Sequence, residues 1–197
     1  GFFNHITGLG TTSLAVDQAS GLVVGTTVVE ADFVLNNARL LTFALGGNKT
    51  RKLEYVLADA RAKGFTSVVT PGPLTSNHTM MTATPCRRVG LDVHCIVAGE
   101  VPHTPADWHG NLLLLDYLGA HLHFSPMNFA NPTPDDGARL DAFCQDVTAK
   151  TGGYFIPGGG TMPAAEPGYM QCIAEIAAQR GGGFDFDHVV VAYGTGS

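Results

Sequence analysis

Two lysines follow a glycine-rich turn in the run Gly46-Gly47-Asn48-Lys49-Thr50-Arg51-Lys52-Leu53-Glu54. A helix is predicted after the turn, so that Lys49 stands at a helix N-terminus. Such a terminus presents unpaired N–H groups and a partial positive charge, and it suits an anion. A lysine with a second cation nearby also loses its proton more easily and can attack a carbonyl carbon. Lys49 is therefore a candidate nucleophile, although a solvated lysine beside a turn would have the same pattern.

Two further polar segments follow predicted strands. Ser76, Asn77 and His78 come after a strand at 66–70 and its Pro-Gly-Pro loop, and Ser76 or Asn77 would cap the next helix. The run Gly194-Thr195-Gly196-Ser197 follows a strand at 188–193, and in front of a helix it would form a nest of N–H groups for phosphate. The alternatives are a helix cap beside an exposed histidine and an ordinary strand-to-helix turn.

Histidine and cysteine spacing indicates no metal centre. His121 and His123 alternate on one strand face and could bind a metal, but the chain has no HxxxH or HExxH spacing. The cysteines are far apart, which favours small buried side chains in a reducing compartment. We therefore expect no metal site and a cytoplasmic location; the four cysteines are Cys86, Cys95, Cys144 and Cys172.

Composition narrows the class of protein. The chain has 197 residues, 45% of them apolar and 14% charged, with 25 glycines, which suits an α/β protein with buried parallel strands and tight turns. A formal charge of −6 argues against nucleic acid or an anionic membrane surface as the main partner. No apolar run reaches the length of roughly 18 residues that a membrane-spanning helix needs, and no signal peptide is recognisable at the first residues.

Helical and strand patterns alternate from residue 52 onward. The predicted helices are 52–63, 76–89, 108–118, 134–151 and 167–179, and the predicted strands are 66–70, 91–98, 121–124, 154–157 and 188–193. Pro85 lies inside the second helix and is expected to kink or end it. This alternation predicts an open parallel sheet with flanking helices, in which ligands bind at the carboxyl ends of strands.

The lysine run resembles the lysine segment of the D-cysteine desulfhydrase and 1-aminocyclopropane-1-carboxylate deaminase family. These are pyridoxal-phosphate enzymes of the tryptophan-synthase β-like fold, fold type II. The resemblance covers about residues 33–197, and its further segments keep their order: 75–78, 110–116, 156–161, 186–192 and 194–197. This collinearity is far more specific than any one of the motifs.

The resemblance implies a role for each matching residue. Lys49 would be the Schiff-base lysine and would later move the α-proton of the substrate. Lys52 would lie near the cofactor phosphate, and Asn77 would hydrogen-bond the 3-oxygen of the pyridine ring. Ser76 and His78 would meet the substrate carboxylate or the cofactor face. The start of the phosphate-binding loop would be Gly194, Thr195, Gly196 and Ser197.

The resemblance also implies an activity, and the departures from the family pattern leave an alternative. A lyase or deaminase of this family would act on a small amino acid such as D-cysteine and release sulfide or ammonia with a 2-oxo acid. The chain departs from the pattern at 35–38, at Thr75 and at Met80-Met81, and the family continues well past the phosphate loop. The alternative is a non-catalytic truncated or split member that acts as a binding or interaction module. A third and weaker alternative is a nucleotide-binding α/β domain, but this chain has no G-x-G-x-x-G pattern followed by an acidic residue.

The resemblance implies a division into domains. Residues 1–51 and 161–197 would belong to a large pyridoxal-phosphate-binding domain, truncated at its C-terminal side, and residues 52–160 would form a small α/β domain. Strands near 33 and 188 would then have exposed edges. We expect a homodimer partner or a complementary C-terminal chain to cover them.

Overall fold

The computed structural model describes residues 49–99, 104–125 and 133–179, together with the backbone of three short strands that precede them. These strands are β1 (Phe2–Ile6), β2 (Thr12–Val16) and β3 (Val23–Val24), which pair antiparallel in the order β1-β2-β3. The predicted strand at 188–193 and the turn at 194–197 lie outside the described residues.

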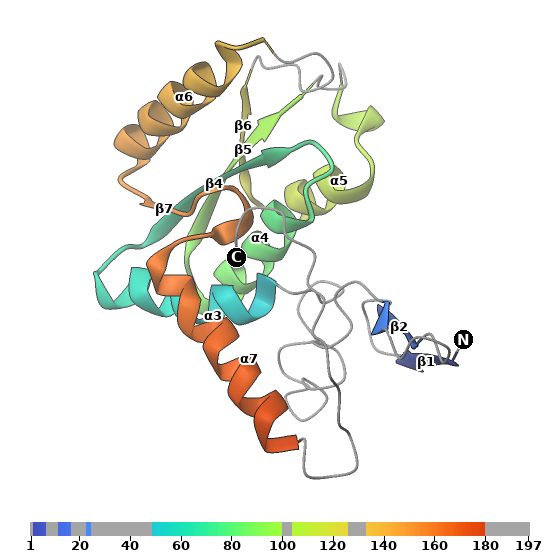
Figure 1. Cartoon of the computed structure of the whole chain (residues 1–197). Coiled ribbons are helices and arrows are strands. Elements are labelled where there is room, and N and C mark those ends of the chain that lie inside the picture. Colours follow the sequence, from blue (N-terminus) through green and yellow to red (C-terminus); the bar gives the residue numbers. More distant parts are fainter. Residues whose placement is uncertain are drawn as a thin grey trace.

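A four-stranded parallel sheet forms the centre of the molecule (Figure 1). Its spatial order is β6-β5-β4-β7, and its strands are β4 (Ser67–Pro73), β5 (Asp92–Ala98), β6 (His121–Ser125) and β7 (Tyr154–Phe155). The middle strands are rich in fully buried β-branched side chains such as Val68, Val69 and Val93. Strands of this composition pack well when both faces of a sheet are covered. The predicted open parallel α/β architecture is confirmed.

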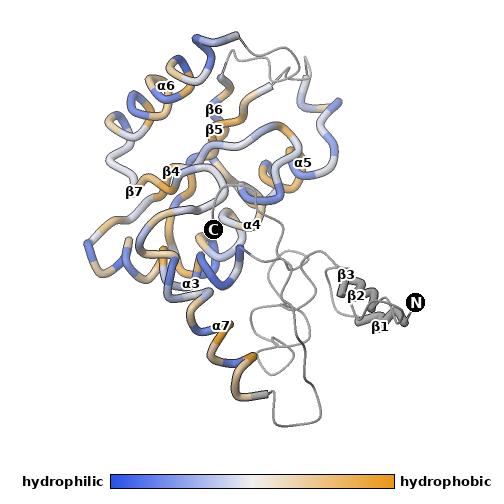
Figure 2. The backbone as a smooth tube through the Cα atoms, viewed as in Figure 1, coloured by the Kyte–Doolittle hydropathy of each residue, from blue (hydrophilic) through white to orange (hydrophobic). Residues whose placement is uncertain are grey.

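Helices cover both faces of this sheet (Figure 1). Helix α6 (Asp136–Thr151) packs Cys144 and Val147 against Val69 and Ile96 on one face. Helices α3 (Lys49–Ala62), α4 (Asn77–Val89) and α5 (Gly110–Tyr117) enclose the larger core on the other face. Helix α7 (Glu166–Gln179) lies against α3, and the 3-10 turns are η2 (Pro105–Asp107), η3 (Gly158–Gly160) and η4 (Pro163–Ala165). Figure 2 shows the apolar central strands and the mixed polarity of the helices around them.

Strand β4 continues through the segment 71–73 that its two prolines predicted to be a loop. The Ile156 N–H donates to the Val69 carbonyl oxygen at 2.8 Å, so Val69 directs its backbone polar groups toward β7. Pro71 and Pro73 stand two and four positions later in the strand, so their backbone nitrogen atoms face the same side as that of Val69. Pro71 and Pro73 therefore lie beyond the end of the two-residue strand β7, where no N–H is needed, while β4 stays paired with β5 as far as Ala98.

Of the two effects expected from Pro85, a kink or an end of the helix, the second does not occur, because α4 continues to Val89. Pro85 is buried, and the neighbouring Ala83 and Cys86 are fully buried in the main core. Packing against β4, β5 and α5 outweighs the local penalty of a proline inside a helix. The other helix boundaries lie within about three residues of the predicted ones.

The cysteines are buried and free of disulfide bonds, as predicted. Burial raises the pKa of the Cys95 thiol to about 12 and that of Cys144 to about 11. These side chains therefore act as small apolar groups, not as nucleophiles.

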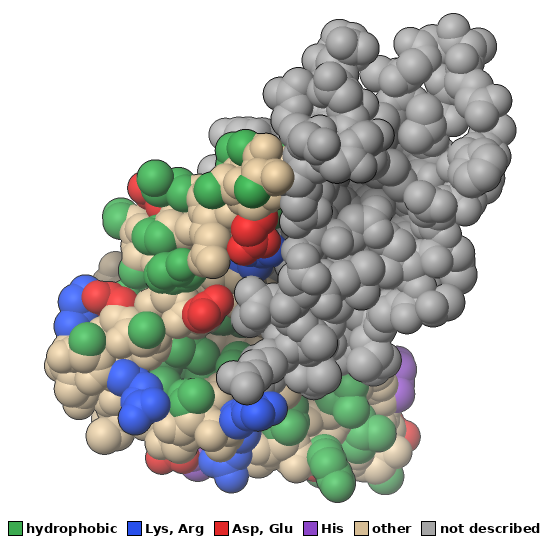
Figure 3. All heavy atoms as spheres, turned by 90° about the horizontal axis from the view of Figure 1, so that it is seen from below, with side chains coloured by type: hydrophobic (Ala, Val, Ile, Leu, Met, Phe, Trp, Pro, Cys, Tyr) green, Lys and Arg blue, Asp and Glu red, His purple; other side chains and the backbone are tan. Residues whose placement is uncertain are grey.

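Charged side chains of both signs are scattered over the molecular face in Figure 3, where no single basic patch stands out among the coloured atoms. Within the described ranges, no helix is long and apolar enough to cross a membrane.

Candidate active site

Both candidate lysines lie in the first turn of α3. Lys49 is its first residue and is half-buried, whereas Lys52 is only 1% exposed. The apolar face formed by Leu53, Val56 and Leu57 draws this helix into the core and takes Lys52 with it. The Lys52 ammonium donates to the Gly159 carbonyl oxygen at 3.2 Å and lies 5.6 Å from the centre of the Tyr169 ring. A buried cation with these two partners is well placed to bind an anion.

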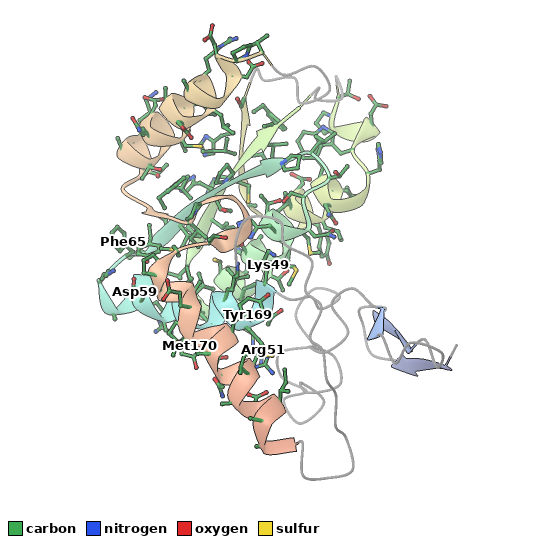
Figure 4. The ribbon with its side chains drawn as sticks, in the orientation of Figure 1. Lys49, Arg51, Asp59, Phe65, Tyr169 and Met170 are labelled. Atoms are coloured by element: carbon green, nitrogen blue, oxygen red, sulfur yellow. The ribbon has the colours of Figure 1, made fainter. Side chains whose placement is uncertain are left out.

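Helix α7 fixes the position of this first turn. Arg51 forms a forked ion pair with Glu175, at 2.6 and 3.3 Å, and Tyr55 donates to Gln171 at 2.6 Å. Gly168 allows the two backbones to touch, since a Cβ there would overlap the Arg51 carbonyl group. Figure 4 shows Arg51 and Tyr169 where α3 and α7 meet. The lysine-bearing turn is therefore held on a rigid support.

The second part of the site is the N-terminus of α4. Ser76 is the N-cap, and its Oγ accepts a hydrogen bond from the Thr79 N–H at 3.2 Å. The turn from β4 brings Ser76 against Gly72, where an added Cβ would lie 2.6 Å from the Ser76 Oγ. Asn77 is exposed, and its Oδ1 accepts a hydrogen bond from the Asn111 Nδ2 at 2.8 Å.

His78 is buried between the two parts of the site. Its Nε2 lies 2.9 Å from the Thr70 hydroxyl, while its Nδ1 is buried without a hydrogen-bond partner among the described residues. Burial, followed by the positive charges of Lys49 and Lys52, lowers the pKa of His78 to about 4, and the nearby Pro157 carbonyl opposes the shift. The imidazole is therefore neutral near pH 7. A buried polar atom without a partner indicates a position for a ligand or an ordered water.

The turn η3 connects the lysine helix with His78. Gly160 has a positive φ of 67°, and a Cβ on it would lie 3.4 Å from the His78 Cε1 and 3.8 Å from the Lys52 Cδ. The fold thus brings Lys49, Lys52 and His78 together near the carboxyl end of β4, and Ser76 and Asn77 flank them at the start of α4. The remaining predicted site residues, 194–197, lie outside the described part of the chain.

A groove of about 550 Å³ opens beside Lys52, with Thr161, Met162 and Tyr169 also in its wall. Of the predicted site residues, Lys52 lines this groove, and the neutral His78 imidazole lies close to Lys52. A buried cation and a neutral imidazole beside the first turns of two helices suit a small ligand that carries anionic groups and a carbonyl. Thr70, Gly159 and Tyr169 were not predicted as site residues. Thr70 and Tyr169 have no distinctive sequence pattern, and Gly159 contributes through its backbone.

Three histidines form a separate cluster on β5 and β6. His94 Nδ1 lies 3.0 Å from His123 Nε2, and the rings of His94 and His121 stack with centroids 4.6 Å apart. Across the described ranges, no group of three or more ligands is arranged to hold a metal ion.

Comparisons with known proteins agree with this geometry. The family model for pyridoxal-phosphate dependent enzymes matches residues 39–197. A protein of Yersinia enterocolitica named D-cysteine desulfhydrase is 36% identical over 157 residues, which is 77% of this chain and 46% of the relative. A protein of Methylobacterium nodulans named 1-aminocyclopropane-1-carboxylate deaminase is 38% identical over 161 residues, 78% of this chain and 46% of the relative.

Structural similarity leads to the same family. The crystal structure of an ACC deaminase homologue has a TM-score of 0.62 and 27% identity to this chain, and it aligns over 83% of this chain and 46% of its own length. The chain spans about half the length of the curated relatives it matches. The family match, these relatives and the parallel sheet are consistent with one another, and the chain belongs to the family of pyridoxal-phosphate dependent enzymes.

Proposed function

We propose that this chain forms part of a pyridoxal-phosphate-dependent lyase or deaminase that acts on a small amino acid, with Lys49 as its Schiff-base lysine. The observation that carries the proposal is the pairing of two lysines in one helical turn with a neutral, buried His78 whose Nδ1 has no partner in the described part of the chain. Two cations close together favour loss of a proton from one of them, and an amine must be neutral to attack a carbonyl.

The residues present fit pyridoxal phosphate. The fit rests on the buried Lys52 ammonium, which lines the groove, on the unpartnered His78 Nδ1, and on Gly160, which passes close to both side chains. In this proposal Lys52 and the turn 194–197 hold the phosphate, and Asn77 donates to the ring 3-oxygen. When bound, the cofactor supplies an electron sink for the carbanion that forms at the substrate α-carbon.

The residues of the chain then have separate tasks. The Lys49 Nζ holds and moves the α-proton once its covalent role is complete. Ser76 and the N–H groups at the start of α4 bind and orient the substrate carboxylate. His78 would lie beside the cofactor, and because its imidazole stays neutral it would add no third positive charge beside Lys49 and Lys52.

The substrate is a proposal drawn from the relatives. The names D-cysteine desulfhydrase and 1-aminocyclopropane-1-carboxylate deaminase favour elimination of sulfide from D-cysteine, or ring opening with loss of ammonia, each giving a 2-oxo acid. Both reactions begin with a small amino acid bound through its carboxylate.

A second candidate function is a non-catalytic binding or interaction module. The observation that favours it is the departure of the sequence from the family pattern at Thr75 and at Met80-Met81. In either case we propose that residues 1–51 and 161–197 contribute to a large cofactor-binding domain and 52–160 to a small domain. A homodimer partner or a complementary chain would complete the site.

A direct assay separates the two functions. The purified protein with pyridoxal phosphate is given D-cysteine, and sulfide and pyruvate are measured; aminocyclopropane carboxylate is tested in parallel for ammonia. The proposed enzyme releases product, and Lys49→Ala abolishes the release. Lys63→Ala is the matched control, because Lys63 follows directly after α3 but is exposed and paired with Asp59. Cofactor binding without turnover of either substrate would favour the binding module.

A further inference from the structure

Asn111, at the start of α5, lies beside the candidate site although nothing in the proposed chemistry uses it. Its Nδ2 donates to the Thr75 carbonyl oxygen at 2.9 Å and to the Asn77 Oδ1 at 2.8 Å. The three residues come from two separate parts of the chain, since Asn111 is 34 positions further along than Asn77 and 36 further than Thr75. These bonds therefore join the start of α5 to the turn between β4 and α4.

The Thr75 carbonyl sets the direction of this hydrogen-bond chain. A backbone carbonyl oxygen can only accept, so the Asn111 side chain must present its NH₂ group to it. An NH₂ group has two hydrogens, and the second is directed at Asn77. The Asn77 amide must then turn its oxygen toward Asn111, because the reverse orientation would place two NH₂ groups against each other.

One consequence is a fixed polarity at Asn77. With its Oδ1 held by Asn111, the side chain of Asn77 presents its Nδ2 hydrogens on the opposite side, where only an acceptor is bound well. An exposed asparagine without such a partner can turn its amide over at little cost. Asn77 is exposed here, so its orientation depends on a neighbour that holds it.

The local backbone supports this placement of Asn111. Gly110 has a positive φ of 57°, and the preceding N-cap, His109, makes no side-chain capping bond. Asn111 therefore enters the first turn of α5 with its side chain directed at the neighbouring loop. A hollow of about 230 Å³ is lined by Leu74, Thr75 and residues 109–112. The hydrogen bonds of Asn111 therefore join the two segments beside a partly open space.

We infer that Asn111 is a positioning residue that locks the Asn77 amide as a hydrogen-bond donor toward an acceptor oxygen of the ligand. The inference rests on the proposed function, in which that acceptor is the 3-oxygen of the pyridine ring. It assigns to α5 a part in cofactor recognition through Asn77, without direct contact with the cofactor. Asn111→Asp would reverse the direction of the hydrogen bond to Asn77, because a carboxylate can only accept and would require the NH₂ group of Asn77.

The test compares two ligands on the same variants. Dissociation constants are measured by absorbance and fluorescence for pyridoxal phosphate and for its analogue that lacks the 3-oxygen. We expect Asn111→Asp and Asn111→Leu to weaken pyridoxal phosphate about tenfold, the size of one hydrogen bond, and to change the analogue by less than about twofold. Combining Asn111→Leu with Asn77→Ala should add no further loss to that of Asn77→Ala alone.

His109→Ala is the matched control, because His109 borders the same hollow and its Nδ1 contacts the Asp107 carbonyl. It should leave both dissociation constants unchanged. An equal loss for the two ligands, or a loss additive with that of Asn77→Ala, would overturn the positioning role while leaving the proposed function intact. If the unmodified protein binds neither ligand, the proposed function is wrong and this inference falls with it.

Discussion

The ammonium group of Lys52 donates a hydrogen bond to the carbonyl oxygen of Gly159, 3.2 Å away, across 107 positions of the chain. This bond ties the first turn of α3 to the glycine turn after β7. It also keeps a positive charge in a place where a lysine is rarely found, since the side chain is almost fully buried. A buried lysine at this position favours a binding role over a structural one, because an apolar residue of similar size would pack as well.

Replacing Lys52 should weaken the binding of a ligand that carries a phosphate more than the binding of one that does not. Lys52→Met is expected to raise the dissociation constant for pyridoxal phosphate about tenfold or more, since it removes a charged hydrogen-bond donor. Binding of pyridoxal, which has no phosphate, should change much less. Fluorescence titration of both ligands measures the difference, with the exposed Lys63→Met as control. Equal losses for the two ligands would contradict the phosphate role.

The close contact of α7 with α3 predicts a steric effect at Gly168. In Gly168→Ala the new Cβ would overlap the Arg51 carbonyl group, so one helix must shift. We expect the free energy of unfolding to fall by about 1–3 kcal/mol, as for other overpacked sites. Gly137→Ala on the exposed part of α6 is the control, because a Cβ there meets no atom within 4 Å. Urea unfolding of both variants tests this, and equal stability of the two would be the contrary result.

The ion pair between Arg51 and Glu175 should stabilise the protein measurably. Glu175→Ala leaves the Arg51 guanidinium, whose side chain is 5% exposed, without its carboxylate. The expected loss is about 1–3 kcal/mol in the free energy of unfolding. Asp146→Ala removes the partner of Lys150 in a pair that is more than half exposed on both sides, and the expected loss there is below about 0.5 kcal/mol. Losses of similar size for the two variants would mean that the Arg51–Glu175 pair contributes no more to the free energy of unfolding than the exposed pair does.

The buried His78 predicts a dependence of stability on pH. Its pKa is about 4 in the folded protein and about 6.5 in an unfolded chain, so below pH 6.5 the unfolded state binds the proton first. The free energy of unfolding should therefore fall as the pH drops from about 6.5 to about 4, by up to about 3 kcal/mol from this group alone.

His78→Asn isolates this contribution, because the other titrating groups are the same in both proteins. Denaturant unfolding between pH 7 and pH 4 should show a shallower decline for the variant. An identical decline would mean that His78 takes up a proton in the folded protein as easily as in the unfolded chain.

Sequence patterns predicted much of the sheet and its helices. The predicted helix at 52–63 corresponds to α3, which packs Leu53, Val56 and Leu57 in the core, and Ser76, one of the two predicted caps, is the N-cap of α4. Failures occurred where tertiary packing overrides local preference. Pro71 and Pro73 are tolerated in β4 because β7 is too short to reach them, and Pro85 is tolerated because α4 is packed on several sides.

Sequence patterns predicted the residues of the candidate site, but not the contacts that those residues make. Lys49, Lys52 and the segment 76–78 were identified by a turn, a cap and the family resemblance. The Thr70 hydroxyl beside His78 and the Asn111 amide beside Asn77 depend on the register of β4 and on the place where α5 begins. Neither follows from spacing along the chain, because each joins residues from separate elements.

The most direct test of the account asks which lysine carries the cofactor. The protein is incubated with pyridoxal phosphate, reduced with borohydride and digested, and the modified peptide is sequenced by mass spectrometry. We expect a pyridoxyl group on Lys49, with no labelling of that peptide in Lys49→Ala. Attachment at Lys52 or at another lysine, or no stable attachment at all, would contradict it.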